Sequence, residues 1–211
     1  MTIQEKIKIL QSHFLFQDLG INELERLAEK IREKVFPART LIISQSEPID
    51  TVYLIYKGIV EIYFLTDEGK IIPIRVKEPP YVVGELNLFD ELSIGSVEAI
   101  QEVHTLMISM HEFIELIKKY PGFGLNVLKI VIEKLRAANK ETINYITKSL
   151  KERTWTLLQV MAPHFSNKEI ALSQEELSLI VGATRARITE VLNELEEQKL
   201  VTLSHRKIKV L

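Results

Sequence analysis

Apolar positions follow a helical period at the start of the chain and a strand period after it. Over residues 3–32 they recur at spacings of three and four, with Asn22 as the expected N-cap, Glu25 at the third helical position and Pro37 closing the stretch. Short β-rich runs then continue to about residue 109, with no helix of useful length between them. The expected strands cover residues 40–44, 52–56, 59–65, 71–76, 81–83, 96–100 and 105–109.

Turn clusters separate these runs at fairly regular intervals, at residues 45–48, 57–58, 66–70 and 78–80. Many short strands with frequent turns are typical of an antiparallel barrel or sandwich. A parallel α/β sheet is not expected, because helices would have to alternate with the strands.

Helical patterns return after Met110, first over residues 111–119 and then in a long helix over about 123–150. A heptad frame in the long helix selects, in steps of four and three, Leu128, Ile132, Leu135, Asn139, Thr142 and Ile146. Such a seam predicts a helix that pairs with its symmetry mate, and Asn139 at an a-type position would fix the register. The alternative is a helix that lies on the barrel without any partner.

The C-terminal stretch predicts three helices, over residues 152–163, 174–181 and 185–199, and two short strands around residues 204–207. Ser173 and Glu176 have the spacing of a capping box at the start of the second helix. Gly182 can take the left-handed conformation that ends this helix, and Thr184 can cap the third. Two helices joined by a short turn with glycine form a helix-turn-helix arrangement.

A helix-turn-helix reads DNA with the start of its second helix, where free amides meet phosphate and side chains reach base edges. The expected contacts are Ser173, Thr184, Arg185, Ala186, Arg187, Thr189, Glu190 and Asn193, with His205, Arg206 and Lys207 at the tip of a wing. Arginine can bind guanine O6 and N7, and glutamate can accept from cytosine N4. Spacing alone leaves open which arginine reads a base and which holds a phosphate.

The distribution of charge along the third C-terminal helix indicates which of its ends would face DNA. The whole chain carries 27 Lys and Arg against 29 Asp and Glu, so it is no polycation. Within the third helix, however, Arg185 and Arg187 precede Glu194, Glu196 and Glu197. The basic end is therefore the end that would enter the groove.

Composition excludes several chemistries. The 211 residues contain no cysteine, which removes disulfides, thiolate metal sites and iron–sulfur clusters. The apolar runs are too short to span a bilayer, and charges near Met1 stand where a signal peptide needs apolar residues, so we expect a cytoplasmic protein with no membrane partner. The motifs GxxxxGK[ST], GxSxG and HExxH are absent, and an enzyme is not expected.

The C-terminal motif resembles the winged helix of the CRP/FNR superfamily of bacterial transcription regulators. The resemblance rests on LSQEELSLIVGATR at 172–185, ITEVL at 188–192 and LEEQKLV at 195–201. Earlier segments also resemble the family: FQDL at 16–19, VYLIYKG at 52–58 and VGEL at 83–86. The resemblance covers nearly the whole chain and implies an α+β fold: an antiparallel, jelly-roll-like β-roll domain over 1–122, a dimerisation helix over 123–150 and a winged helix-turn-helix over 151–211.

The family is expected to act as a homodimer on an inverted repeat in double-stranded DNA, with one recognition helix in each of two successive major grooves. The resemblance also implies contact with RNA polymerase. It places an effector site in the β-roll, at positions that here are Gly84, Glu85, Leu86 and Asn139.

Departures from the family change the expected effector. Cyclic-nucleotide-binding members carry an arginine about ten residues after Gly-Glu, whereas residues 89–97 hold none and contain Asp90 and Glu91. Ala138 and Asn139 replace a hydroxyl pair that contacts adenine. Cyclic AMP is therefore not expected, since a buried anion without a cation is costly. Glu85 could bind some other ligand or could cap a strand–helix turn.

Haem is also not expected, because the five histidines, His13, His104, His111, His164 and His205, show no ligand spacing. The recognition helix keeps Arg185, but Ala186 and Glu190 replace a glutamate and a second arginine of cyclic-AMP-type members, so the operator sequence does not carry over.

A second hypothesis is a sensor module of the same fold that acts mainly through protein contacts. Salt dependence separates the two hypotheses, since DNA binding releases counterions.

Overall fold

The computed structural model describes residues 1–69, 71–89, 92–204 and 207–211. The chain forms two compact units, unit 1 (Met1–Leu135) and unit 2 (Arg136–Leu211), and their boundary falls inside the long helix α4 (Pro121–Thr147). The finer division into 1–122, 123–150 and 151–211 remains a prediction.

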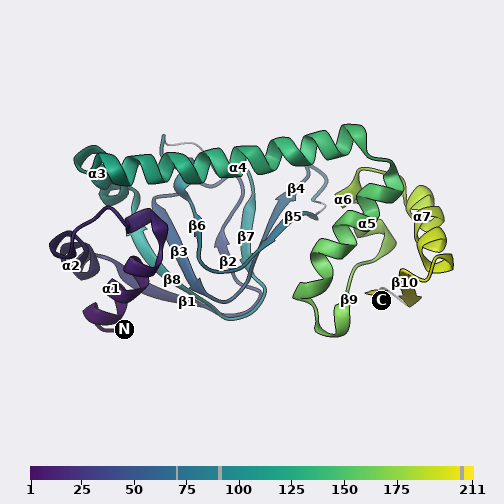
Figure 1. Ribbon diagram of the computed structural model, residues 1–211, viewed down its shortest axis with the longest axis horizontal. Coiled ribbons are helices and arrows are strands. Elements are labelled where there is room, and N and C mark those ends of the chain that lie inside the picture. Colours follow the sequence, from purple (N-terminus) through teal and green to yellow (C-terminus); the bar gives the residue numbers. More distant parts are fainter. Residues whose placement is uncertain (70, 90–91, 205–206) are drawn as a thin grey trace. The chain divides into compact units, whose positions relative to one another are not determined.

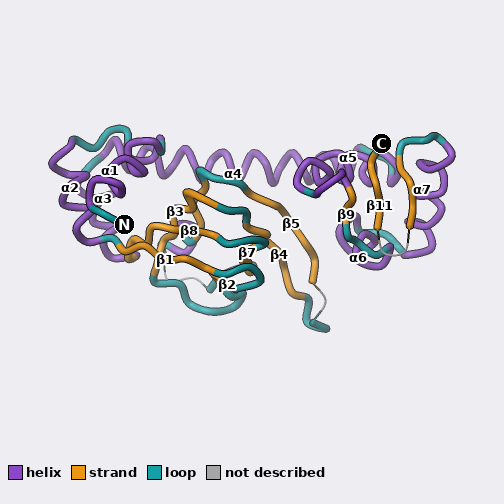
Figure 2. The backbone as a smooth tube through the Cα atoms, turned by 90° about the horizontal axis from the view of Figure 1, so that it is seen from below, coloured by secondary structure: helices purple, strands orange, loops and turns teal. Residues whose placement is uncertain are grey.

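Unit 1 contains two antiparallel sheets, shown as orange segments in Figure 2. One sheet has the order β1-β8-β3-β6 and the other β2-β7-β4-β5. The strands are β1 (Arg32–Phe36), β2 (Leu41–Ile43), β3 (Thr51–Lys57), β4 (Val60–Leu65), β5 (Ile71–Lys77), β6 (Tyr81–Val83), β7 (Ser96–Ala99) and β8 (Val103–Ser109). The predicted α+β fold with an antiparallel β-roll is confirmed.

The sheet that contains β3 is buried on both faces. Val52 and Leu54 pack in a core shared with the helices of unit 1, whereas Ile55 packs in a second core with residues of the other sheet. Successive strand residues point to opposite faces. A strand that is buried on both sides therefore needs the continuous apolar run seen at residues 52–55.

The helices α1 (Ile3–Ser12), α2 (Ile21–Lys30) and α3 (Met110–Lys119) lie together at one end of these sheets (Figure 1). Three buried rings join them to the start of α4. The ring of Phe123 lies 5.6 Å from that of Phe16 and 5.3 Å from that of Phe113. These contacts attach the N-terminal part of α4 to unit 1.

One helical prediction is wrong. The helical stretch does not continue to Arg32 and Pro37, because α2 ends at Lys30 and residues 32–36 form β1, which pairs with β8. The partner strand lies about seventy residues away in sequence, so local spacing carries no sign of it. Asn22 is not the N-cap of α2 either: Gly20 holds that position with an extended backbone and no side-chain cap.

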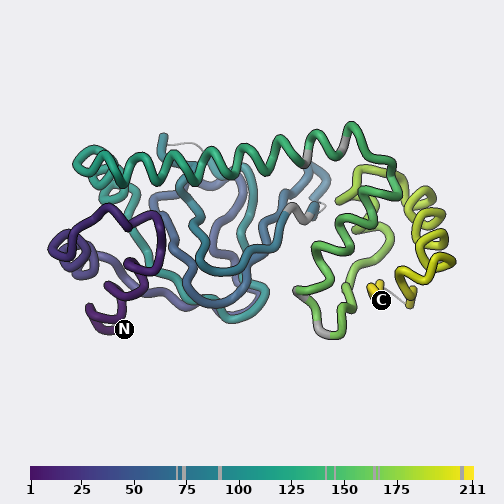
Figure 3. Tube along the Cα trace, in the orientation of Figure 1, coloured from purple at the N-terminus to yellow at the C-terminus, as the bar shows by residue number. Residues whose placement is uncertain are grey.

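Unit 2 begins with the end of α4 and continues with α5 (Leu150–Met161), α6 (Gln174–Val181) and α7 (Arg185–Glu197), coloured green to yellow in Figure 3. Three short strands, β9 (Glu169–Ile170), β10 (Val201–Ser204) and β11 (Lys207–Val210), form a sheet of order β10-β11-β9. The sequence pattern missed β9. It also placed the start of α5 at Glu152, whereas a capping box between Ser149 and Glu152 starts the helix at Leu150.

Candidate nucleic-acid interface

The turn between α6 and α7 is built from three local signals, and all three behave as predicted. The Ser173 hydroxyl accepts from the Glu176 amide, and the Glu176 carboxylate accepts from the Ser173 amide at 2.7 Å. Gly182 ends α6 in the left-handed region, with φ 67°. The Thr184 hydroxyl accepts from the Arg187 amide and caps α7. These contacts fix where α7 begins.

The helix α7 has one buried face and one exposed face. Ile188, Val191, Leu192 and Leu195 are buried in the core of unit 2. The other face exposes Arg185, Ala186, Arg187, Glu190 and Asn193, and Thr189 is half-buried. The structure therefore presents the predicted contact residues of α7 on one exposed surface of its first turns.

The charges on this surface have different partners. Arg187 Nη1 lies 2.9 Å from Glu190 Oε2, and both side chains are mostly exposed. Arg185 forms no ion pair or side-chain hydrogen bond with any residue that the structure describes. The Thr189 hydroxyl donates to Gln174 Oε1 at 2.7 Å and so connects α7 to the start of α6.

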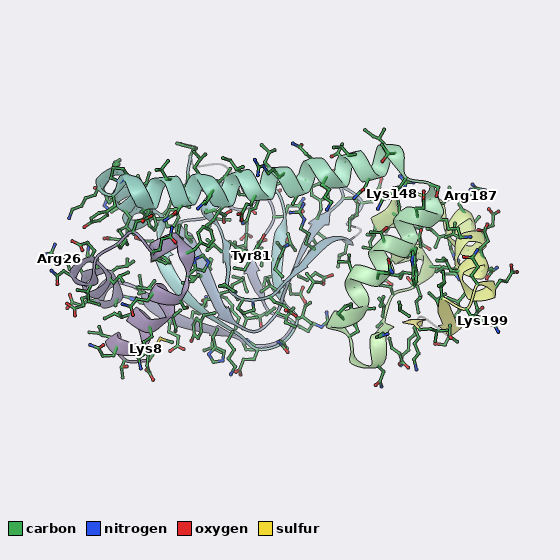
Figure 4. The ribbon with its side chains drawn as sticks, viewed as in Figure 1. Lys8, Arg26, Tyr81, Lys148, Arg187 and Lys199 are labelled. Carbon is green, nitrogen blue, oxygen red and sulfur yellow. The ribbon has the colours of Figure 1, made fainter. Side chains whose placement is uncertain are left out.

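The acidic end of α7 is used inside unit 2. Glu194 forms an ion pair with Lys151 of α5 at 2.9 Å. Glu196 accepts from the amide of Leu203 in β10 at 2.8 Å. Figure 4 labels Arg187 near the start of α7 and Lys199, which follows its end. Two of the acidic residues therefore hold the far end of the helix in place.

The predicted wing is only partly described. His205 and Arg206 lie outside the described residues, and Lys207 is exposed, with its ammonium 3.6 Å from the carboxylate of Glu169. Ser173 is half-buried, and its hydroxyl is engaged in the capping box. Its predicted role at DNA remains untested.

The helix α4 carries two apolar faces. Phe123, Val127 and Ile130 are buried in the core of unit 1. The predicted seam is exposed on the other side, at Leu128, Ile132, Leu135, Asn139, Thr142 and Ile146, and Leu135 is 59% exposed. Leu125, which is 65% exposed, extends the seam by one step of three and was missed. Five residues of the extended seam are therefore apolar side chains exposed to water: Leu125, Leu128, Ile132, Leu135 and Ile146.

The segment expected to hold an effector begins with a constrained glycine. Gly84 has φ 95°, and a Cβ there would lie 2.5 Å from the Thr51 carbonyl oxygen. Glu85 follows and is fully buried, and its Oε1 lies 2.5 Å from Lys134 Nζ of α4. The Lys134 ammonium also donates to the Val82 carbonyl at 2.9 Å and lies 4.7 Å from the ring centre of Tyr81, which Figure 4 labels.

This arrangement differs from the capping role expected for Glu85, and its expected role in ligand binding stays a prediction. Among the described residues, its carboxylate accepts a hydrogen bond from Lys134 and from no backbone amide of the short turn that Gly84 begins. It pairs with Lys134, a residue that the sequence pattern did not single out, and its Oε2 has no hydrogen-bond partner in the described part of the chain. Leu86 is 53% exposed and Asn139 belongs to unit 2. Asp90 and Glu91 lie outside the described residues.

The buried side chain of His13 is fixed by a local hydrogen bond. His13 is buried, and its Nδ1 accepts from the Leu15 amide at 3.1 Å. Burial lowers the pKa of His13 to about 4, because the charged ring would lose its hydration.

Among the described residues, no three His, Cys, Asp or Glu side chains gather as a metal site would require. None of the described helices has the length and apolarity to cross a membrane.

Comparison with known proteins agrees with this arrangement. Residues 33–120 match the model of the cyclic nucleotide-binding domain, and residues 152–211 match that of the Crp-like helix-turn-helix domain. The chain is 23% identical over 209 residues to the CRP-like cAMP-activated global transcriptional regulator of Mycobacterium tuberculosis, covering 95% of this chain and 93% of that protein. It is 26% identical over 183 residues to the CRP of Salmonella typhimurium, covering 83% and 87%.

The fold is also that of solved regulators. The structure of CLP, a c-di-GMP-responsive global regulator of Xanthomonas campestris, matches with a TM-score of 0.72 and 17% identity, over 90% of this chain and 99% of that one. A cyclic nucleotide-binding domain followed in the sequence by a Crp-like helix-turn-helix domain defines a DNA-binding transcription regulator of the helix-turn-helix class. The chain belongs to the CRP/FNR family.

Proposed function

We propose that this regulator is a homodimer that binds an inverted repeat in promoter DNA in a sequence-specific manner and does not require cyclic AMP. The observation that supports DNA reading is the exposed start of α7, where the Arg185 side chain has no partner among the described residues and Arg187 lies one turn after the N-cap Thr184. In this proposal residues 1–122, 123–150 and 151–211 are the sensor, dimerisation and DNA-binding parts. It would act in the cytoplasm with RNA polymerase.

The second apolar face of α4 supports the dimer. Its inner face already packs in unit 1, so the stripe from Leu125 to Ile146 has no role in the packing of the described chain. Apolar residues in alternating steps of three and four favour pairing with a second such helix. Asn139, at an a-type position, would fix the register of the pair.

The independence from cyclic AMP rests on charge. A cyclic phosphate needs a cation in the β-roll, and residues 85–97 contain no arginine or lysine. The ammonium of Lys134, which lies beside this segment, already pairs with Glu85 and the Val82 carbonyl. The M. tuberculosis and S. typhimurium relatives are described as cAMP-activated, and this chain is proposed to differ from them.

The dimer is tested with Leu128→Glu, since a charge at the seam would face its own symmetry copy. We expect sedimentation to show a single subunit and specific DNA binding to fall by tenfold or more. Leu41→Glu is the matched control, because Leu41 is a similarly exposed leucine on an edge strand of unit 1. A Leu128→Glu protein that sediments as a dimer and binds DNA normally would reject the seam.

DNA reading is tested by selection from randomised duplexes. We expect an inverted repeat with half-site centres one helical turn apart, and binding that weakens steeply as salt rises. Addition of cyclic AMP should leave the selected sequence and the affinity unchanged. The protein-contact hypothesis predicts no selected sequence. An affinity that rises tenfold with cyclic AMP would contradict the proposed independence.

A further inference from the structure

Two arginines at the exposed start of α7 differ in their side-chain partners. Arg185 has no ion-pair or side-chain partner among the described residues, whereas the Nη1 of Arg187 donates to Glu190 Oε2 at 2.9 Å. The side chains of Arg187 and Glu190 are 67% and 61% exposed. An exposed pair of this kind contributes little to the stability of a helix. Since stability does not explain the pair, we ask whether it affects how α7 reads DNA.

The geometry of the pair leaves Arg187 able to bind DNA while Glu190 holds it. A guanidinium has five N–H donors in a planar fork, and Glu190 uses one edge of it. The remaining donors can still bind O6 and N7 of one guanine. Glu190 occupies only part of the guanidinium and holds it by that contact. Both groups lie one helical turn apart on the same exposed face.

The carboxylate has the opposite effect on backbone contacts. A phosphate oxygen that approached Arg187 would also approach the negative Glu190, and like charges that are pushed together in a partly dehydrated groove repel. Arg187 with its carboxylate partner is therefore a poor phosphate ligand. Arg185 carries no such partner and is free to bind either a phosphate or a base.

We propose that Glu190 is a positioning residue that holds Arg187 for reading guanine in a G·C pair and disfavours its use as a phosphate contact. This inference rests on the proposed function, because it assumes that α7 enters the major groove. It assigns to Glu190 a role in specificity that is distinct from its contribution to affinity.

The test measures base preference and non-specific affinity separately in the full-length dimer. Glu190→Ala should lower the preference for guanine at one position of each half-site by roughly threefold to tenfold. The same variant should bind a duplex without the site about twofold more tightly, because one repulsive charge is lost. Arg187→Ala should lower the preference at the same position, and the double variant should be no worse there than Arg187→Ala alone.

Glu197→Ala is the matched control. It removes the same charge from the same helix, at an exposed residue of the last turn, and it should leave the base preference unchanged. Glu190→Ala with the wild-type preference at every position would overturn the inference, as would single variants that affect different positions. If the wild-type protein selects no sequence at all, the proposed function itself has failed, and the variants are not needed to show it.

Discussion

Each unit contains a glutamate paired with a basic residue, and the two pairs differ in their surroundings. In unit 1 the side chain of Glu85 is fully buried and that of Lys134 is 18% exposed. In unit 2 Arg187 and Glu190 are each more than 60% exposed. The first pair joins residues 49 positions apart, whereas the second lies within one turn of a helix.

Because of this difference, the two pairs should contribute very differently to the stability of their units. Removing one member of a buried pair leaves a dehydrated charge, which is strongly destabilising, so the pair in unit 1 is tied to the fold. The pair in unit 2 can open or be rearranged at little cost. The structure thus joins α4 to the β-roll through a buried pair, whereas the pair at the start of α7 is exposed.

The largest expected effect tests the buried pair. Lys134→Met should lower the free energy of unfolding of unit 1 by about 3 kcal/mol, because the Glu85 carboxylate loses its cation. Arg187→Met, the matched change in the exposed pair, should alter the stability of unit 2 by less than about 0.5 kcal/mol. Hydrogen exchange of the β3 and β6 amides reports unit 1, and fluorescence of Trp155, the single tryptophan, reports unit 2. Equal losses in both variants would contradict the comparison.

The next largest effect is expected when the pH is lowered, in the free energy of unfolding of unit 1. The pKa of His13 is about 4 in the folded protein against an ordinary value of 6.5, so the unfolded chain takes up the proton first as the pH falls. The free energy of unfolding of unit 1 should therefore fall between pH 6.5 and pH 4, by about 3 kcal/mol at most, and stay level above that range. His13→Asn, which can still accept from the Leu15 amide, should remove this slope. A slope that persists in His13→Asn would mean that another group titrates.

A smaller effect is expected at the exposed surface of α7. Arg185→Ala should weaken specific DNA binding by about 1–3 kcal/mol and relax one base position, without a change in stability. A gel-shift titration with the selected duplex and single-base variants measures both quantities. Unchanged discrimination at every position would assign Arg185 to the phosphate backbone instead of a base.

The smallest effect concerns the turn before α7. Gly182→Ala should destabilise unit 2 by about 1 kcal/mol, since alanine resists the left-handed backbone at φ 67°. Gly84→Ala in unit 1 should cost more, because it adds a collision with the Thr51 carbonyl to the same backbone penalty. Urea unfolding of both variants tests the order. A larger loss for Gly182→Ala would show that the turn carries constraints beyond its backbone angle.

The sequence predicts the helix-turn-helix well because its signals are local. Ser173, Gly182 and Thr184 each act on residues a few positions away, and each does so in the structure. Features that depend on distant partners were missed. β1 forms against β8, and Lys134 meets Glu85 across 49 residues. Leu125, which is 65% exposed, lies one step of three before Leu128 and outside the predicted seam.

We propose that a symmetric dimer places two copies of α7 on one inverted repeat without cyclic AMP. Sedimentation of the protein with the selected duplex, followed by titration with and without cyclic AMP, tests it most directly. We predict two chains per duplex and the same affinity in both titrations. One chain per duplex, or tight binding only when cyclic AMP is present, would contradict the account.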